Sequence, residues 1–352
     1  MKKLGWFNKI VFVLNIVLAV LTFLAYILPF LAPKIFPILS ALTLFLPLML
    51  IFNLLFFTFW FIQFKKQMLL SALMLLLGIT FINKFYRFYT SEIEKSENDF
   101  VVMSYNVRLF NLYEWIKIDD VDLRISNFIK EQNPDILCIQ EYSEKNRTDF
   151  RVYQHQLTYL EGDKSSLGQA IFSKYPIVNK GKIEFPDSRN KAVFADVKRG
   201  KDTIRVYSIH LQSVNITPDI HEIDDNFQDG ITQERSIKIL QRISTAFRFQ
   251  QQQAEILREH RNGCTYPVII CGDMNNSAFS YVYRILKGNL NDTFEKAGTG
   301  FGKTYSFRFY PARIDYIFAD KIFDIKSHHS FPDFQNSDHF PVVSRMSFKS
   351  QD

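Results

Sequence analysis

Several apolar, strand-like runs in this 352-residue chain end in a polar side chain that packing alone does not require. The runs are FVVMSYNV (100–107), DILCIQE (135–141), TIRVYSIHL (203–211), PVIICGDMN (267–275), RIDYIFA (313–319) and PVVSRMSF (341–348). The polar residues at the ends of the first four runs are Asn106, Glu141, His210, Asp273 and Asn275; Asp315 lies near the start of RIDYIFA, and Asp338 and His339 come just before the last run. Polar groups are costly to bury without partners. If the strand ends meet at one edge of a sheet, these side chains form an acidic cleft lined by histidine.

This mixture of side chains suits the hydrolysis of a phosphate ester. A carboxylate such as Glu141 can hold Mg²⁺, a hard cation that prefers oxygen ligands. The cation neutralises charge that develops on the phosphoryl oxygens. A second carboxylate must then orient a water molecule, and amide and imidazole donors must meet the oxyanion as it forms. One such residue is usually structural, but a set in the same relative position indicates a site.

The ordered motifs MSYNV, IQE, SIHL, GDMN, RIDYIF and SDH together resemble the endonuclease/exonuclease/phosphatase superfamily. This superfamily includes deoxyribonuclease-I-like nucleases, apurinic endonucleases, inositol-polyphosphate 5-phosphatases and bacterial sphingomyelinases. The resemblance covers about residues 100–350, and the segment GQAIFSKYPI supports the same alignment. It implies a four-layered α/β sandwich, with two packed mixed β-sheets flanked by helices and the site at one end.

The resemblance also implies a divalent metal cofactor and its ligands. Glu141 would be the principal ligand of Mg²⁺, assisted by Asn106 and Asp338. Mn²⁺ is the alternative metal. Both are hard enough cations for a set of carboxylate and amide oxygens.

Five further residues take catalytic roles under the same resemblance. Asp273 would orient or deprotonate the attacking water, and Asn275 and His210 would donate hydrogen bonds to the scissile phosphate. His339 would contact the phosphate, and Asp315 would fix the tautomer and charge of His339. A carboxylate that orients an imidazole is a recurrent catalytic arrangement.

One position departs from the pattern of the apurinic endonucleases. Those enzymes often carry an acid two residues after the first asparagine, where this chain has Arg108. A metal ligand is thus missing, and direct transfer of DNA-repair activity is in doubt. We expect Arg108 to contact substrate phosphate instead, and Arg189, which precedes a predicted strand, to do the same.

Alternating strands and helices must position these residues. Beside the runs above, QAIFSKYPI (169–177) and AVFADVK (192–198) read as strands, and 121–132, 231–261 and 277–287 read as helices. Short β-rich runs separated by helical stretches predict a layered α/β domain.

The first 90 residues differ from the rest, because they hold eight Lys or Arg and no Asp or Glu. Three apolar stretches, about 10–31, 36–64 and 68–84, predict about three transmembrane helices, since a span needs ~20 apolar residues. The third is short for a span. We therefore expect a transmembrane anchor over 1–90, a polar linker over 91–99 and a catalytic domain over 100–350.

Basic residues in the short flanks predict the orientation in the cytoplasmic membrane. Five of them place the N-terminus and the second connection in the cytoplasm: Lys2, Lys3, Lys9, Lys65 and Lys66. Lys34, Lys84 and Arg87 fall on the other side. With three spans the catalytic domain lies on the non-cytoplasmic side, and with two it is cytoplasmic; we favour three.

The net charge of the predicted catalytic domain bears on the class of substrate. Of 42 basic residues, 34 lie beyond residue 90 against 36 acidic ones, so the net charge of that part is −2. A duplex-binding domain usually carries a strongly basic face. The sequence therefore predicts a membrane-anchored, Mg²⁺-dependent phosphodiesterase acting on nucleic acid, or on a lipid headgroup or other small phosphoester, with no obligate protein partner. The alternative is a catalytically silent membrane-bound scaffold, but a decayed site is expected to have lost Glu141, Asp273 or His339.

Overall fold

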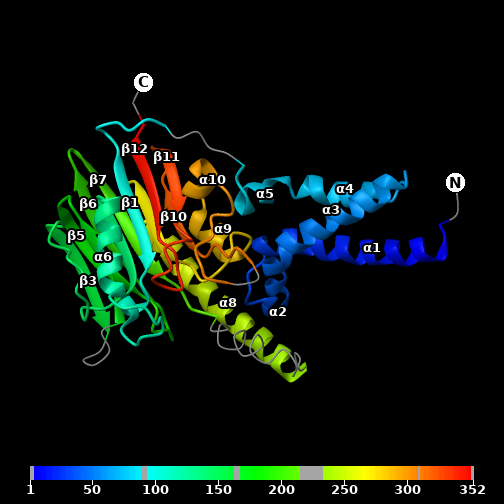
Figure 1. The fold of residues 1–352 in the computed structure, drawn as a ribbon, viewed down its shortest axis with the longest axis horizontal. Coiled ribbons are helices and arrows are strands. Elements are labelled where there is room, and N and C mark those ends of the chain that lie inside the picture. Colours follow the sequence, from blue (N-terminus) through cyan, green and yellow to red (C-terminus); the bar gives the residue numbers. More distant parts are fainter. Residues whose placement is uncertain (1–3, 89–92, 162–166, 215–232, 308–309, 350–352) are drawn as a thin grey trace. The chain divides into compact units, whose positions relative to one another are not determined.

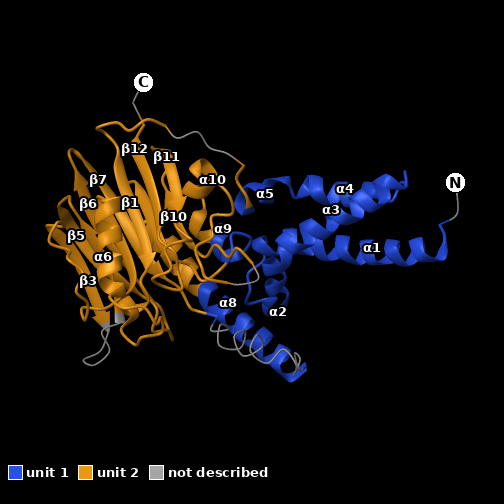
Figure 2. Ribbon diagram, viewed as in Figure 1, with its two compact units in different colours: residues 1–85, 214–251, 277–284 blue, residues 86–213, 252–276, 285–352 orange. Residues whose placement is uncertain are grey.

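The computed structural model describes residues 4–88, 93–161, 167–214, 233–307 and 310–349 (Figure 1). The chain forms two compact units (Figure 2). The first comprises residues 1–85, 214–251 and 277–284, and the second comprises residues 86–213, 252–276 and 285–352.

The second unit contains two six-stranded sheets. The first sheet has the order β11-β12-β1-β2-β4-β3. Its strands are β1 (Phe100–Asn106), β2 (Ile136–Tyr142), β3 (His155–Glu161), β4 (Leu167–Ser173), β11 (Phe323–Ser330) and β12 (Val342–Phe348). The pair β1 and β2 is parallel, and the other neighbours are antiparallel. The sheet is therefore mixed.

The second sheet has the order β5-β6-β7-β8-β10-β9. Its strands are β5 (Ile177–Glu184), β6 (Lys191–Arg199), β7 (Asp202–His210), β8 (Val268–Asp273), β9 (Asn291–Asp292) and β10 (Asp315–Ala319). Here β7 and β8 form the parallel pair, again within an otherwise antiparallel sheet.

The two sheets pack face to face around one apolar core. Val102, Cys138 and Ile171 from the first sheet share a buried cluster with Ile269 and Cys271 from the second. Burial of such side chains is the main favourable contribution to folding. The three cysteines of the chain are free thiols.

Helices cover the outer faces of both sheets. Helix α6 (Val121–Gln132) packs Ile125 and Phe128 against Met103 and Leu137 of the first sheet. On the second sheet, α8 (Gln233–Asn262) brings His260 to the hydroxyl of Tyr207 at 2.9 Å, and the short α10 (Thr293–Ala297) also borders that sheet. The predicted four-layered α/β sandwich is thus confirmed.

The predicted elements match closely, with two exceptions. The run QAIFSKYPI was expected to be one strand, but β4 ends at Ser173 and β5 begins at Ile177 in the other sheet. The chain crosses between sheets at Lys174–Pro176, where Pro176 cannot donate a ladder hydrogen bond. Helix α9 (Tyr281–Lys287) begins four residues later than expected.

The first unit contains the apolar helices. They are α1 (Trp6–Ile27) with η1 (Leu28–Phe30), α2 (Pro37–Ser40) with η2 (Ala41–Phe45), α3 (Leu46–Ile62), α4 (Met68–Leu77) and α5 (Ile79–Phe85). Residues Trp6–Phe30 and Pro37–Ile62 are long and apolar enough to cross a membrane. The third predicted segment is a pair of helices bent by 60°, with a break at Gly78. A methyl group at Gly78 would lie 2.3 Å from the hydroxyl of Tyr26, so glycine permits close packing there.

Polar side chains join these helices. Asn15 donates to Ser71 at 2.8 Å and accepts from the indole of Trp60 at 3.1 Å, which links α1, α4 and α3. Asn53 donates to Thr22 at 2.9 Å. Hydrogen bonds between helices stabilise their association in an apolar solvent. Most of the remaining surface of α1 and α3 is exposed and apolar.

Candidate catalytic site

Three predicted site residues occupy one row across the second sheet. His210 ends β7 and pairs in register with Asp273 at the end of β8. Asp273 pairs in turn with Asp315 at the start of the antiparallel β10. Residues directly opposite on neighbouring strands have adjacent side chains on the same face. The sheet register alone therefore brings His210, Asp273 and Asp315 together.

Asn106 joins this row to the first sheet. It is fully buried at the end of β1, and its side-chain nitrogen donates to Glu141 Oε1 and to Asp273 Oδ2, each at 3.2 Å. Its side-chain oxygen accepts the backbone N–H of Arg108 at 3.1 Å. One amide group thus holds carboxylates from both sheets in place.

A β-bulge places Glu141. The pairing of β2 with β4 shifts between Gln140 and Tyr142, and Glu141 has a φ of 49°. A positive φ is uncommon for a residue with a Cβ and marks local strain, which structures retain mainly at functional positions. The carboxylate lies 3.7 Å from His210 Nε2 and is one-quarter exposed, so it remains open to a ligand from solvent.

His339 is held as an imidazolium. Its Nδ1 lies 3.0 Å from Asp315 Oδ2, and its Nε2 lies 3.6 Å from Asp273 Oδ2. Burial alone would lower the pKa of His339, but the negative charges of Asp315, Asp273 and Asp338 outweigh burial and raise it to about 10. The ring is therefore charged at neutral pH and can stabilise an anion, but it cannot accept a proton.

Asp273, in contrast to His339, can accept a proton at neutral pH. Burial raises its pKa to about 6 and Asp315 adds to the rise, while His339 and His210 oppose it. Above about pH 6 it is a carboxylate of raised basicity, which suits a general base. Asn275 supports it: its backbone N–H donates to Asp273 Oδ1 at 2.8 Å, and its side-chain nitrogen donates to Oδ2 at 3.1 Å.

The two predicted substrate-binding arginines differ in placement. Arg108 joins the site, because its guanidinium lies 3.4 Å from Asp338 Oδ2 and 4.6 Å from the ring of Trp115. Arg189 lies on the loop before β6 with an exposed side chain. No hydrogen bond or ion pair joins Arg189 to the described residues of the site.

The donor set fits a divalent cation. One ligand atom each of Asp273, Asp315 and His339 lies within 4.8 Å of the others, a spacing that could hold a metal if His339 gave up its proton. The predicted ligands Glu141 and Asn106 lie beside Asp273, whereas the third, Asp338, is paired with Arg108. Four carboxylates face two imidazoles and one guanidinium here, so a cation of hard character matches the charge.

Several supporting contacts were not predicted from the sequence. Ser337 donates to the carbonyl oxygen of Asn106 at 2.9 Å, and Thr304 Oγ1 accepts the N–H groups of Ile314 and Asp315, both at 3.0 Å. Gln140 donates to Ser208 at 3.0 Å, from the first sheet to the second. Ser337 and Gln140 lie inside the SDH and IQE motifs, so their positions in the sequence could have indicated that they support the site. Thr304 lies in no motif.

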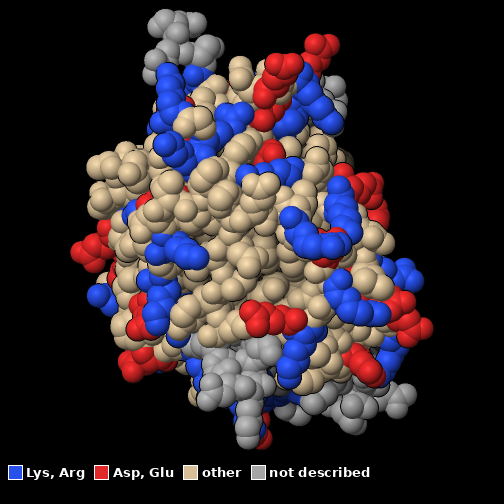
Figure 3. Space-filling model, turned by 90° about the vertical axis from the view of Figure 1, so that its left-hand side faces the viewer, with Lys and Arg blue, Asp and Glu red and all other residues tan. Residues whose placement is uncertain are grey.

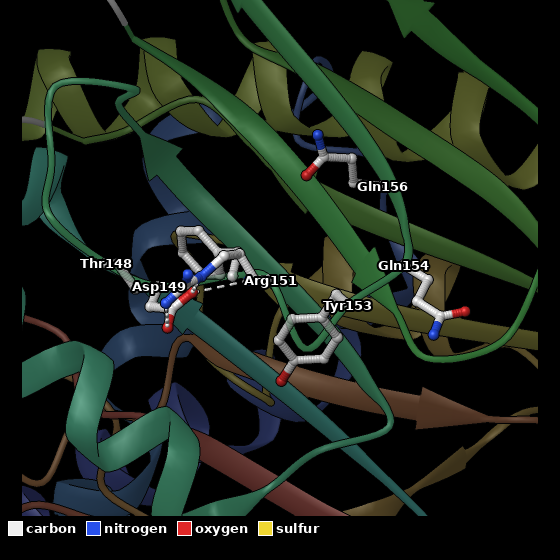
Figure 4. A pocket seen from close by; sticks show the side chains of 7 residues that line it. Thr148, Asp149, Arg151, Tyr153, Gln154 and Gln156 are labelled. Carbon is white, nitrogen blue, oxygen red and sulfur yellow. Dashed lines mark hydrogen bonds and ion pairs between the residues drawn. The ribbon is translucent and has the colours of Figure 1, made fainter.

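A surface hollow of about 590 Å³ lies elsewhere in this unit (Figure 4). It is lined by Thr148, Asp149, Phe150, Arg151, Tyr153, Gln154 and Gln156. Gln156 follows His155, and His155 pairs with Ser173 of β4. Ser173 pairs in turn with Ile136, which begins β2, whereas Glu141 lies near the other end of that strand. The charged pair in the hollow, Asp149 and Arg151, is satisfied at 2.9 Å. The hollow is therefore separate from the catalytic cluster.

The fold and the polar cluster define a phosphoester hydrolase of the layered α/β type. The model of the Endonuclease/Exonuclease/phosphatase family matches residues 103–339. The chain belongs to this family and is a hydrolase of phosphoester bonds. A second model, described as Domain of unknown function (DUF8431), matches residues 8–85. No curated protein matches the chain by sequence.

Solved structures share the fold at low sequence identity. An endonuclease/exonuclease/phosphatase from Beutenbergia cavernae DSM 12333 has a TM-score of 0.53 at 19% identity, over 72% of each chain. The human Nocturnin catalytic domain with bound sulfate has a TM-score of 0.52 at 20% identity, over 74% of this chain and 97% of that one. A mannosyl-6-phosphatase from Bacteroides thetaiotaomicron VPI-5482 has a TM-score of 0.52 at 20% identity, over 71% and 100%.

The charge on His339 makes stability depend on pH. A folded-state pKa of about 10, above the ordinary 6.5, stabilises the fold fully below pH 6.5, and this contribution is lost as the pH rises through about 10. We expect Asp315→Asn to cost about 3–5 kcal/mol at neutral pH, as for other broken buried pairs. The cost should shrink as the pH rises from 6.5 to about 10. Thermal unfolding of the full chain across this range measures it, with Asp324→Asn as control; a cost independent of pH would contradict the pairing.

Proposed function

We propose that this protein is a membrane-anchored, Mg²⁺-dependent phosphoesterase that hydrolyses a phosphodiester by attack of water. One observation carries the proposal: a single amide, Asn106, contacts both the Glu141 and the Asp273 carboxylates, with His210 and His339 within 4 Å of Asp273. A hydrolase needs a base, donors for the oxyanion and a place for a cation at one point. This cluster supplies all three.

Asp273 is the base in this scheme. Its carboxylate takes a proton from the attacking water, whose oxygen forms the new bond to phosphorus while the ester P–O bond breaks. The leaving oxygen departs as an alkoxide and takes up a proton from solvent. Hydrogen bonds from Asn275 and Asn106 hold the Asp273 carboxylate in one orientation. Precise orientation of reacting groups accounts for a large part of catalysis. Asn275 also donates to the carbonyl of Leu211 at 3.0 Å, so binding a phosphate oxygen would require it to exchange a partner.

Two imidazoles are assigned to the phosphate. His339 is charged at neutral pH and offers Nε2 toward Asp273, so it stabilises negative charge on the phosphoryl oxygens. Asp315 binds Nδ1 and fixes the ring. His210 lies between Glu141 and Asp273 and donates to the same phosphate. Glu141, with Asn106 and Asp338, would hold Mg²⁺ or Mn²⁺, and the cation when bound neutralises charge on the substrate.

The proposal leaves two classes of substrate, nucleic acid and a lipid headgroup or other small phosphoester. On the face drawn in Figure 3, Lys and Arg side chains are interspersed with Asp and Glu, and neither sign forms a continuous stripe. This face therefore lacks the stripe that a duplex tracked by its phosphates requires. The intact cluster counts against a catalytically silent scaffold.

The proposal places the active domain next to a membrane. Two apolar helices and the bent pair Met68–Phe85 would form three spans over residues 1–90, followed by a linker over 91–99 and the catalytic domain over 100–350. Five flanking basic residues against three favour a catalytic domain on the non-cytoplasmic side of the cytoplasmic membrane.

Asp273→Asn should reduce turnover of a phosphodiester about 10²–10⁴-fold, because it removes the base but keeps the shape of the side chain. The full chain in detergent is assayed with Mg²⁺ on DNA, RNA, sphingomyelin and bis-p-nitrophenyl phosphate. Asp324→Asn is the control, and circular dichroism verifies folding. Undiminished turnover in the folded variant would refute the role of Asp273.

Glu141→Gln should weaken metal binding by at least about 10–100-fold, a loss typical even of residues outside the ligand shell. Calorimetric titration of the full chain with Mn²⁺ measures affinity without turnover. The exposed Glu259→Gln serves as control. An unchanged titration would show that Glu141 is not a ligand.

The orientation is tested by fusing a reporter that is active only outside the cytoplasm after Asp352. We expect an active reporter, because three spans carry the catalytic domain across the membrane. Deleting residues 68–85 should silence it. An expressed but silent fusion on the unmodified chain would mean that the domain faces the cytoplasm.

A further inference from the structure

Two exposed aromatic side chains stand on the loop that leaves β1 beside the site. Tyr113 is 61% exposed and Trp115 is 43% exposed. Their rings meet edge to face, with centroids 5.1 Å apart. Single exposed aromatic residues are common, whereas adjacent exposed aromatic rings beside a polar cluster are a feature of binding sites. We call this pair the aromatic platform.

The loop that carries the platform is held by side-chain contacts. Arg108, Leu109, Phe110 and Asn111 have φ angles of 44°, 54°, 55° and 61°, four successive left-handed residues without a glycine. The side chain of Asn111 holds the turn by donating to the carbonyl of Ile116 at 2.8 Å and accepting its N–H at 2.9 Å. Phe110 is buried in the core of the first sheet. Strained backbone kept in place by surrounding contacts is typical of functional sites.

The platform is coupled to the catalytic cluster through Arg108. The backbone N–H of Arg108 donates to the side chain of Asn106, and its guanidinium stacks on Trp115 at 4.6 Å while it pairs with Asp338 at 3.4 Å. The side chain is about one-third exposed. A flat cation and two aromatic rings thus extend from the cluster toward solvent.

We propose that the aromatic platform binds an unpaired nucleobase of the substrate, so that the phosphoester cleaved belongs to a nucleotide or a single strand. This rests on the proposed function and names its substrate class. Aromatic side chains stack on bases of any sequence, and a guanidinium adds to the stack. Stacking requires no basic stripe, which agrees with the net charge of −2 beyond residue 90. A sugar phosphate has no aromatic ring to stack. A choline headgroup can bind an aromatic ring by cation–π attraction, but the guanidinium of Arg108 already lies over Trp115 and would repel this second cation.

The fluorescence of Trp115 can report whether a ligand is bound to the aromatic platform. The chain has three tryptophans, and Trp6 and Trp60 belong to the first unit, so Trp115 is the single one of the second. Subtracting the fluorescence of a Trp115→Phe variant from that of the parent isolates its signal. The parent is full-length Asp273→Asn in detergent with EDTA, which separates binding from turnover.

The probes are adenosine 5′-monophosphate, ribose 5-phosphate and phosphocholine. We expect saturable quenching of Trp115 by adenosine monophosphate alone. Trp115→Leu should weaken calorimetric binding of this nucleotide about tenfold, the value of one stacked base. The matched control is Tyr266→Leu, an aromatic residue 42% exposed just before β8, at the opposite end of that strand from Asp273.

Three results would overturn the inference. These are equal quenching by ribose 5-phosphate or phosphocholine, quenching by phosphatidylglycerol vesicles in place of the nucleotide, and no response to the nucleotide. If the wild-type chain still cleaves a phosphodiester with Mg²⁺ in any of these cases, the proposed function stands and only the platform fails. If the nucleotide binds as expected but the wild-type chain cleaves no phosphodiester, the platform stands and the proposed function fails.

Discussion

One side-chain amide holds the site together. Asn106 ends a strand of the first sheet, and its nitrogen contacts a carboxylate of that sheet, Glu141, and one of the other sheet, Asp273. The two sheets must therefore stay in register at this end for the cluster to exist. Gln140 reaches Ser208 across the same interface one residue deeper, and the shared apolar core fixes the separation of the sheets. Packing of apolar side chains, which are not themselves reactive, sets the distances on which the chemistry depends.

Burial and neighbouring charges then give the clustered residues different protonation states. Asp315 and Asp273 keep His339 protonated, whereas burial makes Asp273 a stronger base than an exposed aspartate. The protonated imidazole of His339 and the basic carboxylate of Asp273 thus lie 3.6 Å apart. The excess of carboxylates is a reason to expect a bound cation, because unpaired negative charge is costly in a buried site. Arg108 offsets part of it at Asp338, and so joins the charge balance of the site to the loop that leaves β1.

The sequence by itself determined which reactive groups are present and most of the scaffold. Polar residues at the ends of apolar runs identified the cluster, since nothing else explains Asp273 or His210 beside buried strands. The period of apolar residues located α6 and α8 nearly to the residue, because local backbone preferences and one buried face suffice for a helix. Long uncharged stretches identified α1 and α3 as apolar helices for the same reason.

Tertiary structure decided what depends on neighbours distant in sequence. The edge strands β3 and β5 are polar on one side and are stabilised as strands by pairing with β4 and β6. The bulge that turns Glu141 toward the cluster arises from its register with β4. The pairing of Arg108 with Asp338, separated by 230 positions along the chain, could not be read from either motif. Sequence patterns encode which groups are present and which face they take, whereas distances between charges follow only from how the two sheets pack.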